Sequence, residues 1–303
     1  MVEPVRFRYN DETGDSNTFQ SAPASGEAQT IAMEAVQEHR ALRDLLVSNG
    51  VHVTVVRCHE RTPDAPFCNN WFSTHPAVAL QDADGTRHAP ATLVLYPLLA
   101  PNRRIERRAD LIAMLRTKYP RMVDLSGYER EARFLESTGS LCLDDANRVA
   151  YAALSPRTDR ALVEHFGREL GYRVEAFTAT DATGVPYYHT NVMMCIGHGL
   201  AGVTLEAIES PVERASVEDS LKAGGLELLG ITRAQAAQFC GNVLSLTNDA
   251  GEALFVMSSA ASRAFTATQR DRLTAHGRIL ASELSAFERV GGGSARCLIA
   301  ELF

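Results

Sequence analysis

The chain has 303 residues, of which 45% are hydrophobic and 22% are charged, and its formal net charge is −7 at pH 7. These values are typical of a globular protein that buries a core, whereas a general nucleic-acid-binding protein usually presents a basic face. No apolar run approaches the roughly 18 residues that a membrane-spanning helix needs, and residues 1–9 lack the apolar stretch of a signal peptide. We therefore expect no nucleic acid and no membrane as partner.

The cysteines and the metal-binding patterns give further limits. Six cysteines occur without paired spacing, which favours a reducing compartment over a disulfide framework. The sequence contains neither a CxxC pair nor an HExxH motif, so a zinc site has little support. These observations predict a cytoplasmic protein that uses no metal and no other cofactor.

The first half of the chain contains two predicted units of similar order. A strand at 71–80, a turn at 82–85, a strand at 92–98, a helix near 103–118 and a strand at 122–125 form the first. The second is the clearest: strands at 140–147 and 148–154, a helix over 158–170 that ends at Gly171, and a strand at 172–177. The repeated order is strand, turn, strand, helix, strand.

The second half repeats this order. The third unit has strands at 192–196, 202–208 and 226–229 and a helix near 214–223. The fourth has strands at 243–247 and 253–258 and a helix near 268–286. The fifth is split between the termini: residues 297–303 are predicted to pair with residues 5–9, followed by a helix near 30–48 and a strand at 51–56.

Each unit starts with a short apolar segment that is led by a polar or reactive residue. The leading residues are Asn70, Glu136, His189, Asn242 and Cys297, at steps of 53 to 66 positions. A nearly constant step of this size indicates an internally repeated architecture, and termini that complete one repeat are a known way to close a ring. We therefore predict an α/β fold, a pseudo-fivefold α/β propeller of strand–strand–helix–strand repeats, as a single domain over residues 1–303. An ordinary α/β sheet with incidental turns is the alternative.

A ring would bring the leading side chains to one axis. Cys297 follows the glycine-rich loop at 291–294, and a cysteine thiolate is a strong nucleophile that needs a nearby cation or base to form. His189 can protonate a leaving amine and then activate water, and Glu136 can accept hydrogen bonds from substrate N–H groups. Each residue alone has an ordinary structural explanation, so the prediction depends on their shared position in the repeat.

Several motifs in order resemble the guanidine-modifying superfamily of arginine deiminases, dimethylarginine dimethylaminohydrolases and amidinotransferases. They are FCNNWFSTH (67–75), NRRIERR (102–108), LESTGS (135–140), SPRT (155–158), YHTN (188–191) and GGSARC (292–297). The likeness is greatest to the arginine-deiminase-related branch that includes citrulline-utilisation hydrolases. The resemblance implies a pseudo-fivefold propeller with a Cys-His-Glu catalytic core.

The resemblance also implies roles for individual residues. Cys297 would be the nucleophile, His189 the acid and base, and Glu136 the carboxylate that orients the substrate. Arg104 and Arg157 match arginines that hold a substrate carboxylate, a task that suits a planar guanidinium. The neighbouring Arg103, Arg107 and Arg108 are expected on a solvated helix face.

Two departures from the deiminase pattern bear on the substrate. Asn70 and Asn191 stand where arginine deiminases have aspartates that bind a cationic guanidinium. An amide offers both a donor and an acceptor, so it complements a neutral ureido group better than a carboxylate does. A further departure is Glu136-Ser137-Thr138-Gly139 in place of Glu-Gly-Gly-Asp.

The sequence thus predicts a cysteine-dependent hydrolase of a linear ureido or guanidino C–N bond. Citrulline is the first choice as the small-molecule amino-acid substrate, with ornithine, ammonia and carbon dioxide as products. Arginine or dimethylarginine hydrolysis is an alternative, and a non-catalytic propeller that binds an amino acid is another. The oligomeric state, monomer or homo-oligomer, stays open.

Overall fold

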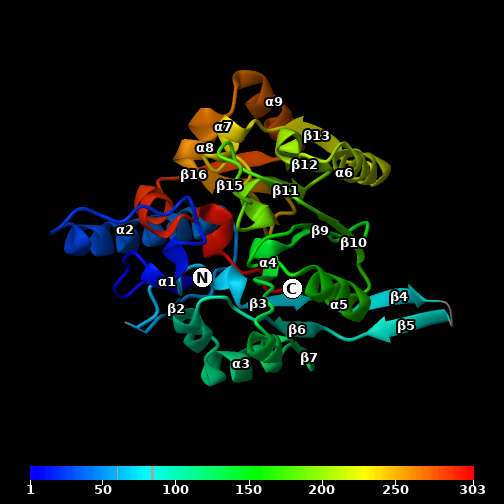
Figure 1. The fold of residues 1–303 in the computed structure, drawn as a ribbon, viewed down its shortest axis with the longest axis horizontal. Coiled ribbons are helices and arrows are strands. Elements are labelled where there is room, and N and C mark those ends of the chain that lie inside the picture. Colours follow the sequence, from blue (N-terminus) through cyan, green and yellow to red (C-terminus); the bar gives the residue numbers. More distant parts are fainter. Residues whose placement is uncertain (60, 83–84) are drawn as a thin grey trace.

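Four three-stranded sheets with the same pairing pattern form the framework of the computed structural model, which describes residues 1–59, 61–82 and 85–303 (Figure 1). In each sheet the middle strand is antiparallel to the first strand and parallel to the third. The strands are β3 Phe72–His75, β6 Thr92–Leu95, β7 Arg121–Asp124, β8 Cys142–Asp144, β9 Val149–Ala153, β10 Arg173–Phe177, β11 Met194–Gly197, β12 Leu200–Val203, β13 Glu227–Gly230, β14 Leu244–Thr247, β15 Ala253–Ser258 and β16 Arg278–Ser282. The chain therefore has the mixed α/β fold with several small sheets that the repeats predicted.

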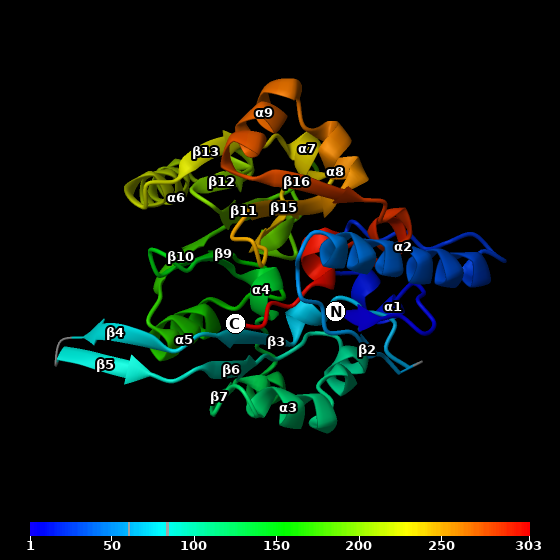
Figure 2. The ribbon, with the colours of Figure 1, turned by 180° about the vertical axis from the view of Figure 1, so that it is seen from behind.

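Helices cover the outer sides of the sheets (Figures 1 and 2). The longer ones are α2 Ala28–Ser48, α3 Ala109–Arg116, α5 Arg160–Leu170, α6 Pro211–Ala223 and α9 Ala267–His276, and the shorter ones are α1 Asp11–Gly14, α4 Ser137–Ser140, α7 Arg233–Ala236 and α8 Ser259–Ala264. Helix α5 shows why the sequence prediction succeeded. The Asp159 side chain accepts a hydrogen bond from the Leu162 N–H at its start, and Gly171 ends it with φ 74°.

The helix predicted near 268–286 is wrong in its second half. Helix α9 ends at His276, and residues 278–282 form β16, which pairs in parallel with β15. Gly277 separates the two elements, and a Cβ there would lie 2.9 Å from the Ala253 carbonyl oxygen. Residues 278–282 therefore pair with the free edge of β15, although their helical periodicity alone assigned them to the same helix as α9.

The unit at the termini also differs from its prediction. Residues 297–303 form no strand, and residues 5–9 do not pair with them. Instead, β1 (Val2–Glu3) pairs in parallel with β2 (Val56–Arg57). The C-terminal segment is held by side chains, because Thr74 Oγ1 donates to the Glu301 carbonyl (2.8 Å) and Tyr119 Oη to the Phe303 carbonyl (2.6 Å).

The first unit carries an additional hairpin. The predicted strand at 71–80 is divided into β3 and β4 (Val78–Asp82), and β4 pairs with β5 (Gly85–Ala89) in an arm that projects from the body (Figure 2). The predicted turn at 82–85 includes Ala83 and Asp84, which lie outside the described residues. Within the described residues, no helix combines the length and apolarity needed to cross a bilayer.

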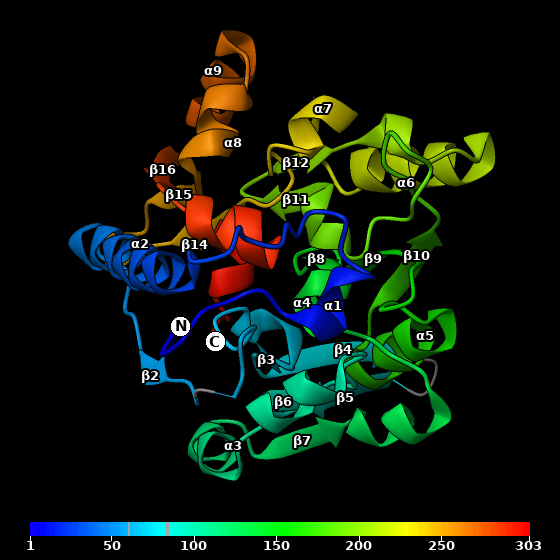
Figure 3. The same ribbon diagram turned by 60° about the vertical axis from the view of Figure 1, so that its left-hand side comes forward.

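The leading residues lie in or directly beside short turns, and none of them lies in a strand. Asn70 ends the 3₁₀ helix Cys68–Asn70, Glu136 precedes α4, and His189 precedes the 3₁₀ helix Thr190–Val192. Cys297 lies in the 3₁₀ helix Ala295–Leu298, and Asn242 lies in the turn before β14. These turns meet near the middle of the molecule, where Figure 3 shows α1 and α4 beside the red C-terminal segment.

Candidate active site

Glu136 is the centre of the polar network at this meeting point. Its Oε2 accepts hydrogen bonds from His189 Nε2 (2.8 Å) and Arg157 Nη1 (3.3 Å), and its Oε1 accepts one from the Leu99 N–H (3.0 Å). Burial alone would raise the pKa of this carboxyl, but the charges of Arg157 and Arg103 and the hydrogen bond of His189 hold it well below its usual range. Glu136 is therefore a buried, ionised carboxylate.

The ionised Glu136 determines which ring nitrogen of His189 carries the proton. Burial lowers the pKa of His189 to about 4, although the hydrogen bond and charge of Glu136 oppose this shift. The imidazole is therefore neutral near pH 7. Because a carboxylate can only accept, the proton of the neutral ring lies on Nε2, which leaves Nδ1 as a basic nitrogen.

Cys297 lies among side-chain amides. Its Sγ is 3.2 Å from Asn242 Nδ2 and 3.6 Å from Asn191 Nδ2, and both amides are buried. Burial raises the pKa of the thiol, and the hydrogen bond of Asn242 and the charge of Arg296 lower it only in part. In the free protein Cys297 is thus a protonated thiol, and deprotonation must accompany the reaction.

Arg157 lies where the sequence predicted a residue of the site. Its Nη2 donates to Ser16 Oγ (2.7 Å) and to the Thr13 carbonyl (3.2 Å), while Nη1 faces Glu136. The guanidinium also lies 5.2 Å from the ring centroid of Tyr188. Arg157 therefore links the catalytic carboxylate to the N-terminal segment that covers it.

The assignment of neighbouring arginines needs a correction. Arg103, expected on a solvated face, is only 2% exposed and donates to Asn70 Oδ1 (2.8 Å) and to both oxygens of Glu106 (2.9 and 3.0 Å). Arg104 instead donates to the Leu98 and Leu99 carbonyls and is not among the residues that line the site cavity. Residues 101–106 form a 3₁₀ helix, and this turn sends adjacent side chains in different directions.

Asp64 is a residue of the site that the sequence did not reveal. Its Oδ2 accepts from Asn10 Nδ2 (2.7 Å) and Thr13 Oγ1 (3.1 Å), whereas its Oδ1 is buried without a hydrogen-bond partner. Asp64 lines the same cavity as Cys297, His189 and Arg157. A buried carboxylate oxygen without a partner is costly, so this atom is suited to a cationic or N–H group of a ligand.

The loop after Glu136 explains one departure from the deiminase pattern. Ser137 adopts φ 47°, a conformation that favours glycine, and its Oγ donates to the Phe72 carbonyl (2.9 Å). At Gly139 there is no room for a side chain, since a Cβ would lie 2.6 Å from Asn70 Nδ2 and 2.7 Å from His189 Nδ1. Gly139 therefore allows the side chains of Asn70 and His189 to lie directly against this loop.

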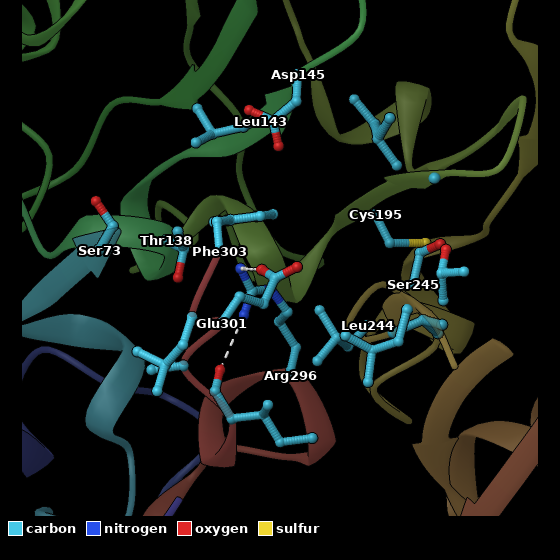
Figure 4. A pocket seen from close by; sticks show the side chains of 18 of the residues that line it. Ser73, Thr138, Leu143, Asp145, Cys195, Leu244, Ser245, Arg296, Glu301 and Phe303 are labelled. Atoms are coloured by element: carbon cyan, nitrogen blue, oxygen red, sulfur yellow. Dashed lines mark hydrogen bonds and ion pairs between the residues drawn. The ribbon is translucent and has the colours of Figure 1, made fainter. Parts of the chain in front are cut away.

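Two cavities border the site. The cavity lined by Cys297, His189 and Asn70 has a volume of only about 10 Å³ and is also lined by Thr13 and Gly293. A larger cavity of about 750 Å³ is lined by residues that include Asn191 and Arg296, and Figure 4 shows the Arg296 side chain in it. The Cys297 thiol, the His189 imidazole and Asp64, whose Oδ1 has no hydrogen-bond partner, all line the small cavity.

The cavity residues do not resemble a metal site. Among the described residues, no group of three or more histidine, cysteine, aspartate or glutamate side chains is placed to hold a metal ion. The polar groups that line the small cavity are a thiol, an imidazole, amides, hydroxyls and charged side chains, and among the charged ones Asp64 Oδ1 is buried without a hydrogen-bond partner.

A family model described as "N,N dimethylarginine dimethylhydrolase, eukaryotic" matches residues 3–303. The chain belongs to this family. The match confirms the resemblance to the amidinotransferase and arginine-deiminase-like superfamily, and the protein is accordingly a hydrolase of non-peptide C–N bonds. No curated protein matches the sequence.

Solved structures show the fold of this dimethylhydrolase-family chain. ArgZ, an arginine dihydrolase from the ornithine–ammonia cycle in cyanobacteria, superposes with a TM-score of 0.72 at 17% identity, over 98% of this chain and 39% of ArgZ. A Cys-to-Ser variant of the ArgZ N-terminal domain bound to substrate gives 0.73 at 16% identity, over 98% of this chain and 95% of that domain. A dimethylarginine dimethylaminohydrolase adduct gives 0.62 at 14% identity, covering 98% and 96%. The chain thus spans about two fifths of full-length ArgZ.

Proposed function

We propose that this protein hydrolyses the ureido group of citrulline, giving ornithine, ammonia and carbon dioxide. The observation that carries the proposal is the orientation of the Asn70 amide. Arg103 has only donors and occupies Asn70 Oδ1, so Asn70 offers N–H groups to the cavity. One N–H goes to Asn69 Oδ1 (3.0 Å), and the other is suited to the carbonyl oxygen of a ureido group. A guanidinium has no such acceptor.

The other end of the cavity complements an α-amino acid. Asp64 and Arg157 both contact Thr13, the first through the Thr13 hydroxyl and the second through its carbonyl. The free Asp64 oxygen would accept from the α-ammonium, and Arg157 would donate to the α-carboxylate. Because the cavity holds only about 10 Å³, Thr13 and its neighbours must move outward before a substrate enters.

The groups at the reacting end allow a two-step hydrolysis. His189 Nδ1 takes the proton of Cys297, whose sulfur attacks the ureido carbon. The proton then passes from His189 to the departing amine as the C–N bond breaks, which leaves a thiocarbamate on Cys297. Water attacks this carbon and gives a proton to His189, which passes it to the sulfur as the C–S bond breaks, and the released carbamate decomposes to ammonia and carbon dioxide. One water is consumed for each citrulline, and Glu136 holds the imidazole in place throughout.

The proposal extends to the architecture. Four sheets of identical pairing and the split unit at the termini support a pseudo-fivefold α/β propeller that forms a single domain over residues 1–303. All six cysteines are free thiols, which suits a reducing cytoplasm. The protein would act there on a small amino acid, as a monomer or a homo-oligomer, without a metal or other cofactor.

Arginine is the second candidate substrate. A variant of AgrE, at 18% identity and a TM-score of 0.72, was crystallised with L-arginine, and ArgZ is named an arginine dihydrolase. The free oxygen of Asp64 could bind a guanidinium instead of an α-ammonium. Dimethylarginine is the third candidate substrate, of the same chemical class as arginine and in keeping with the family name.

A substrate comparison tests the proposal. Purified protein is incubated with citrulline, arginine, dimethylarginine and agmatine, and ammonia, dimethylamine, citrulline and ornithine are measured, with Cys297→Ser as the blank. We expect citrulline to have the highest kcat/KM and to give ornithine and ammonia in equal amounts. A higher kcat/KM for arginine than for citrulline would show that arginine, the second candidate, is the preferred substrate.

The two arginines that the sequence assigned to the carboxylate provide a matched pair. Arg157→Ala should raise KM for citrulline by about 10- to 100-fold, because one or two charged hydrogen bonds are lost. Arg104→Ala, on the same side of the protein but outside the cavity, should change KM by less than about threefold. Equal effects of the two changes would show that Arg157 does not bind the carboxylate.

A further inference from the structure

Asn242 is a leading residue of the repeat for which neither the sequence nor the proposed reaction supplied a role. It lies in the turn before β14 and is fully buried. Its side chain makes three contacts: Oδ1 accepts from the Arg296 N–H (3.0 Å), and Nδ2 donates to the Asn191 carbonyl (3.0 Å) and lies 3.2 Å from Cys297 Sγ. It thus touches the proposed reacting atom.

These contacts fix which end of the amide faces the sulfur. If the amide were turned over, Nδ2 would meet the Arg296 N–H, and Oδ1 would meet the Asn191 carbonyl and the sulfur lone pairs. Like groups would then oppose each other at each position. A donor at Cys297 Sγ is therefore built into the fold.

The group that orients Asn242 is itself held firmly. The side chain of Arg296 projects into the larger cavity and donates to Glu301 Oε2 and the Ile299 carbonyl, both at 3.0 Å (Figure 4). This anchor keeps the backbone of residue 296 in place, so its N–H keeps Asn242 Oδ1 engaged. The amide donor reaches the sulfur already oriented.

We propose that Asn242 is a catalytic residue whose side-chain N–H stabilises the Cys297 sulfur as it becomes anionic. A hydrogen bond to a thiolate is charge-assisted and stronger than one to a thiol, so the contact favours the reacting state over the resting one. It offsets part of the cost of forming an anion in a buried site, with Arg296 as the nearby positive charge and His189 and Tyr188 as titratable neighbours in the same cavity. The proposal rests on Cys297 as nucleophile, whichever ureido or guanidino compound is the substrate.

Two variants separate the loss of the donor from the gain of a charge. Asn242→Ala removes the donor without adding charge, whereas Asn242→Asp keeps an acceptor for the Arg296 N–H but turns an oxygen towards the sulfur. The thiolate is followed by its absorbance near 240 nm, and each titration is corrected by the same variant carrying Cys297→Ser. Asn248→Ala, in the exposed turn of the next hairpin, is the control.

We expect the midpoint of the Cys297 titration to rise by about one pH unit in Asn242→Ala and by more in Asn242→Asp. For the best substrate kcat should fall at least about tenfold at pH 7.5, with little change in KM and with the control unchanged. A midpoint that stays within a few tenths of a unit in a folded variant overturns the proposal, even if thermal stability falls, because a purely structural role would lower stability alone.

If neither substitution yields folded protein, Asn242→Ser, which retains a small donor, replaces them and should give a smaller shift. An unchanged midpoint in Asn242→Ser together with full kcat would count against the proposal. The titration needs no substrate, so its outcome is separate from the substrate comparison. A shifted midpoint in a protein that hydrolyses none of the four compounds would reject the proposed function and retain the role of Asn242.

Discussion

The two halves of the candidate active site differ in charge. One half is an ionic network of Asp64, Arg103, Glu106, Glu136 and Arg157, in which Glu136 alone contacts two cations and an imidazole. The other half surrounds the thiol with side-chain amides, Asn191 and Asn242. The charges of Arg157 and Arg103 keep Glu136 ionised although it is buried, whereas burial raises the pKa of the Cys297 thiol and leaves it protonated. We propose that the charged half orients the substrate and the imidazole, and that the amide half binds the group of the substrate that reacts.

Replacing the nucleophile tests the amide half most severely. Cys297→Ser should lower kcat by about 10⁴-fold or more, because a serine hydroxyl is a far weaker nucleophile beside a neutral imidazole. Ammonia release measures the loss, and the melting temperature checks that the fold is kept. Cys142→Ser, at another buried cysteine that lines only the larger cavity, should retain activity. Substantial turnover by Cys297→Ser would remove this cysteine from the mechanism.

Glu136→Gln tests the charged half. Neutralising the carboxylate leaves Arg157 and Arg103 without their shared partner and removes the group that holds the His189 tautomer. We expect kcat to fall about 10³-fold and the free energy of unfolding to fall by about 3–5 kcal/mol.

The matched control for this change is Glu129→Gln. Glu129 pairs with Arg104 and Arg107 outside the cavity, so kcat should change by less than about threefold. If Glu136→Gln kept both activity and stability, the description of Glu136 as the centre of the network would be incorrect.

Gly139→Ala tests the contact between the two halves. A Cβ at this position requires Asn70 or His189 to shift, and a misplacement of up to about 1 Å costs about 100-fold in rate. Gly127→Ala is the control, because nothing lies within 4 Å of a Cβ there. An active Gly139→Ala enzyme with unchanged kcat would show that this approach of Asn70 and His189 is not required.

The double change Asn70→Asp, Asn191→Asp should replace one amide of the small cavity and one amide beside the thiol by carboxylates. Two carboxylates complement a guanidinium and repel a ureido oxygen, so the ratio of kcat/KM for arginine over citrulline should rise at least about tenfold. Added negative charge raises the pKa of Cys297 and slows both reactions, so the ratio is the quantity to compare. An unchanged ratio would contradict the role assigned to the amides.

Sequence periodicity located most of the framework because it depends on local signals. Helix α5 has an aspartate cap, an apolar stripe and a terminal glycine, and each of these is visible in the sequence. The assignment failed where a neighbouring element decided the outcome. Residues 278–282 became a strand because β15 offered them a partner. Residues 299–303 formed none because side chains of β3 and its surroundings bind their backbone.

In the candidate site, too, some features follow from the sequence and others depend on the tertiary structure. The sequence by itself determined that Cys297, His189, Glu136 and Asn242 occupy equivalent places in a repeat, and the fold brings such places together. Only the tertiary structure decided that Arg103 and not Arg104 turns inward, and that Asp64 keeps a free carboxylate oxygen. The reason is that side-chain direction within a 3₁₀ turn, and the pairing of a buried charge, depend on atoms far away in the chain.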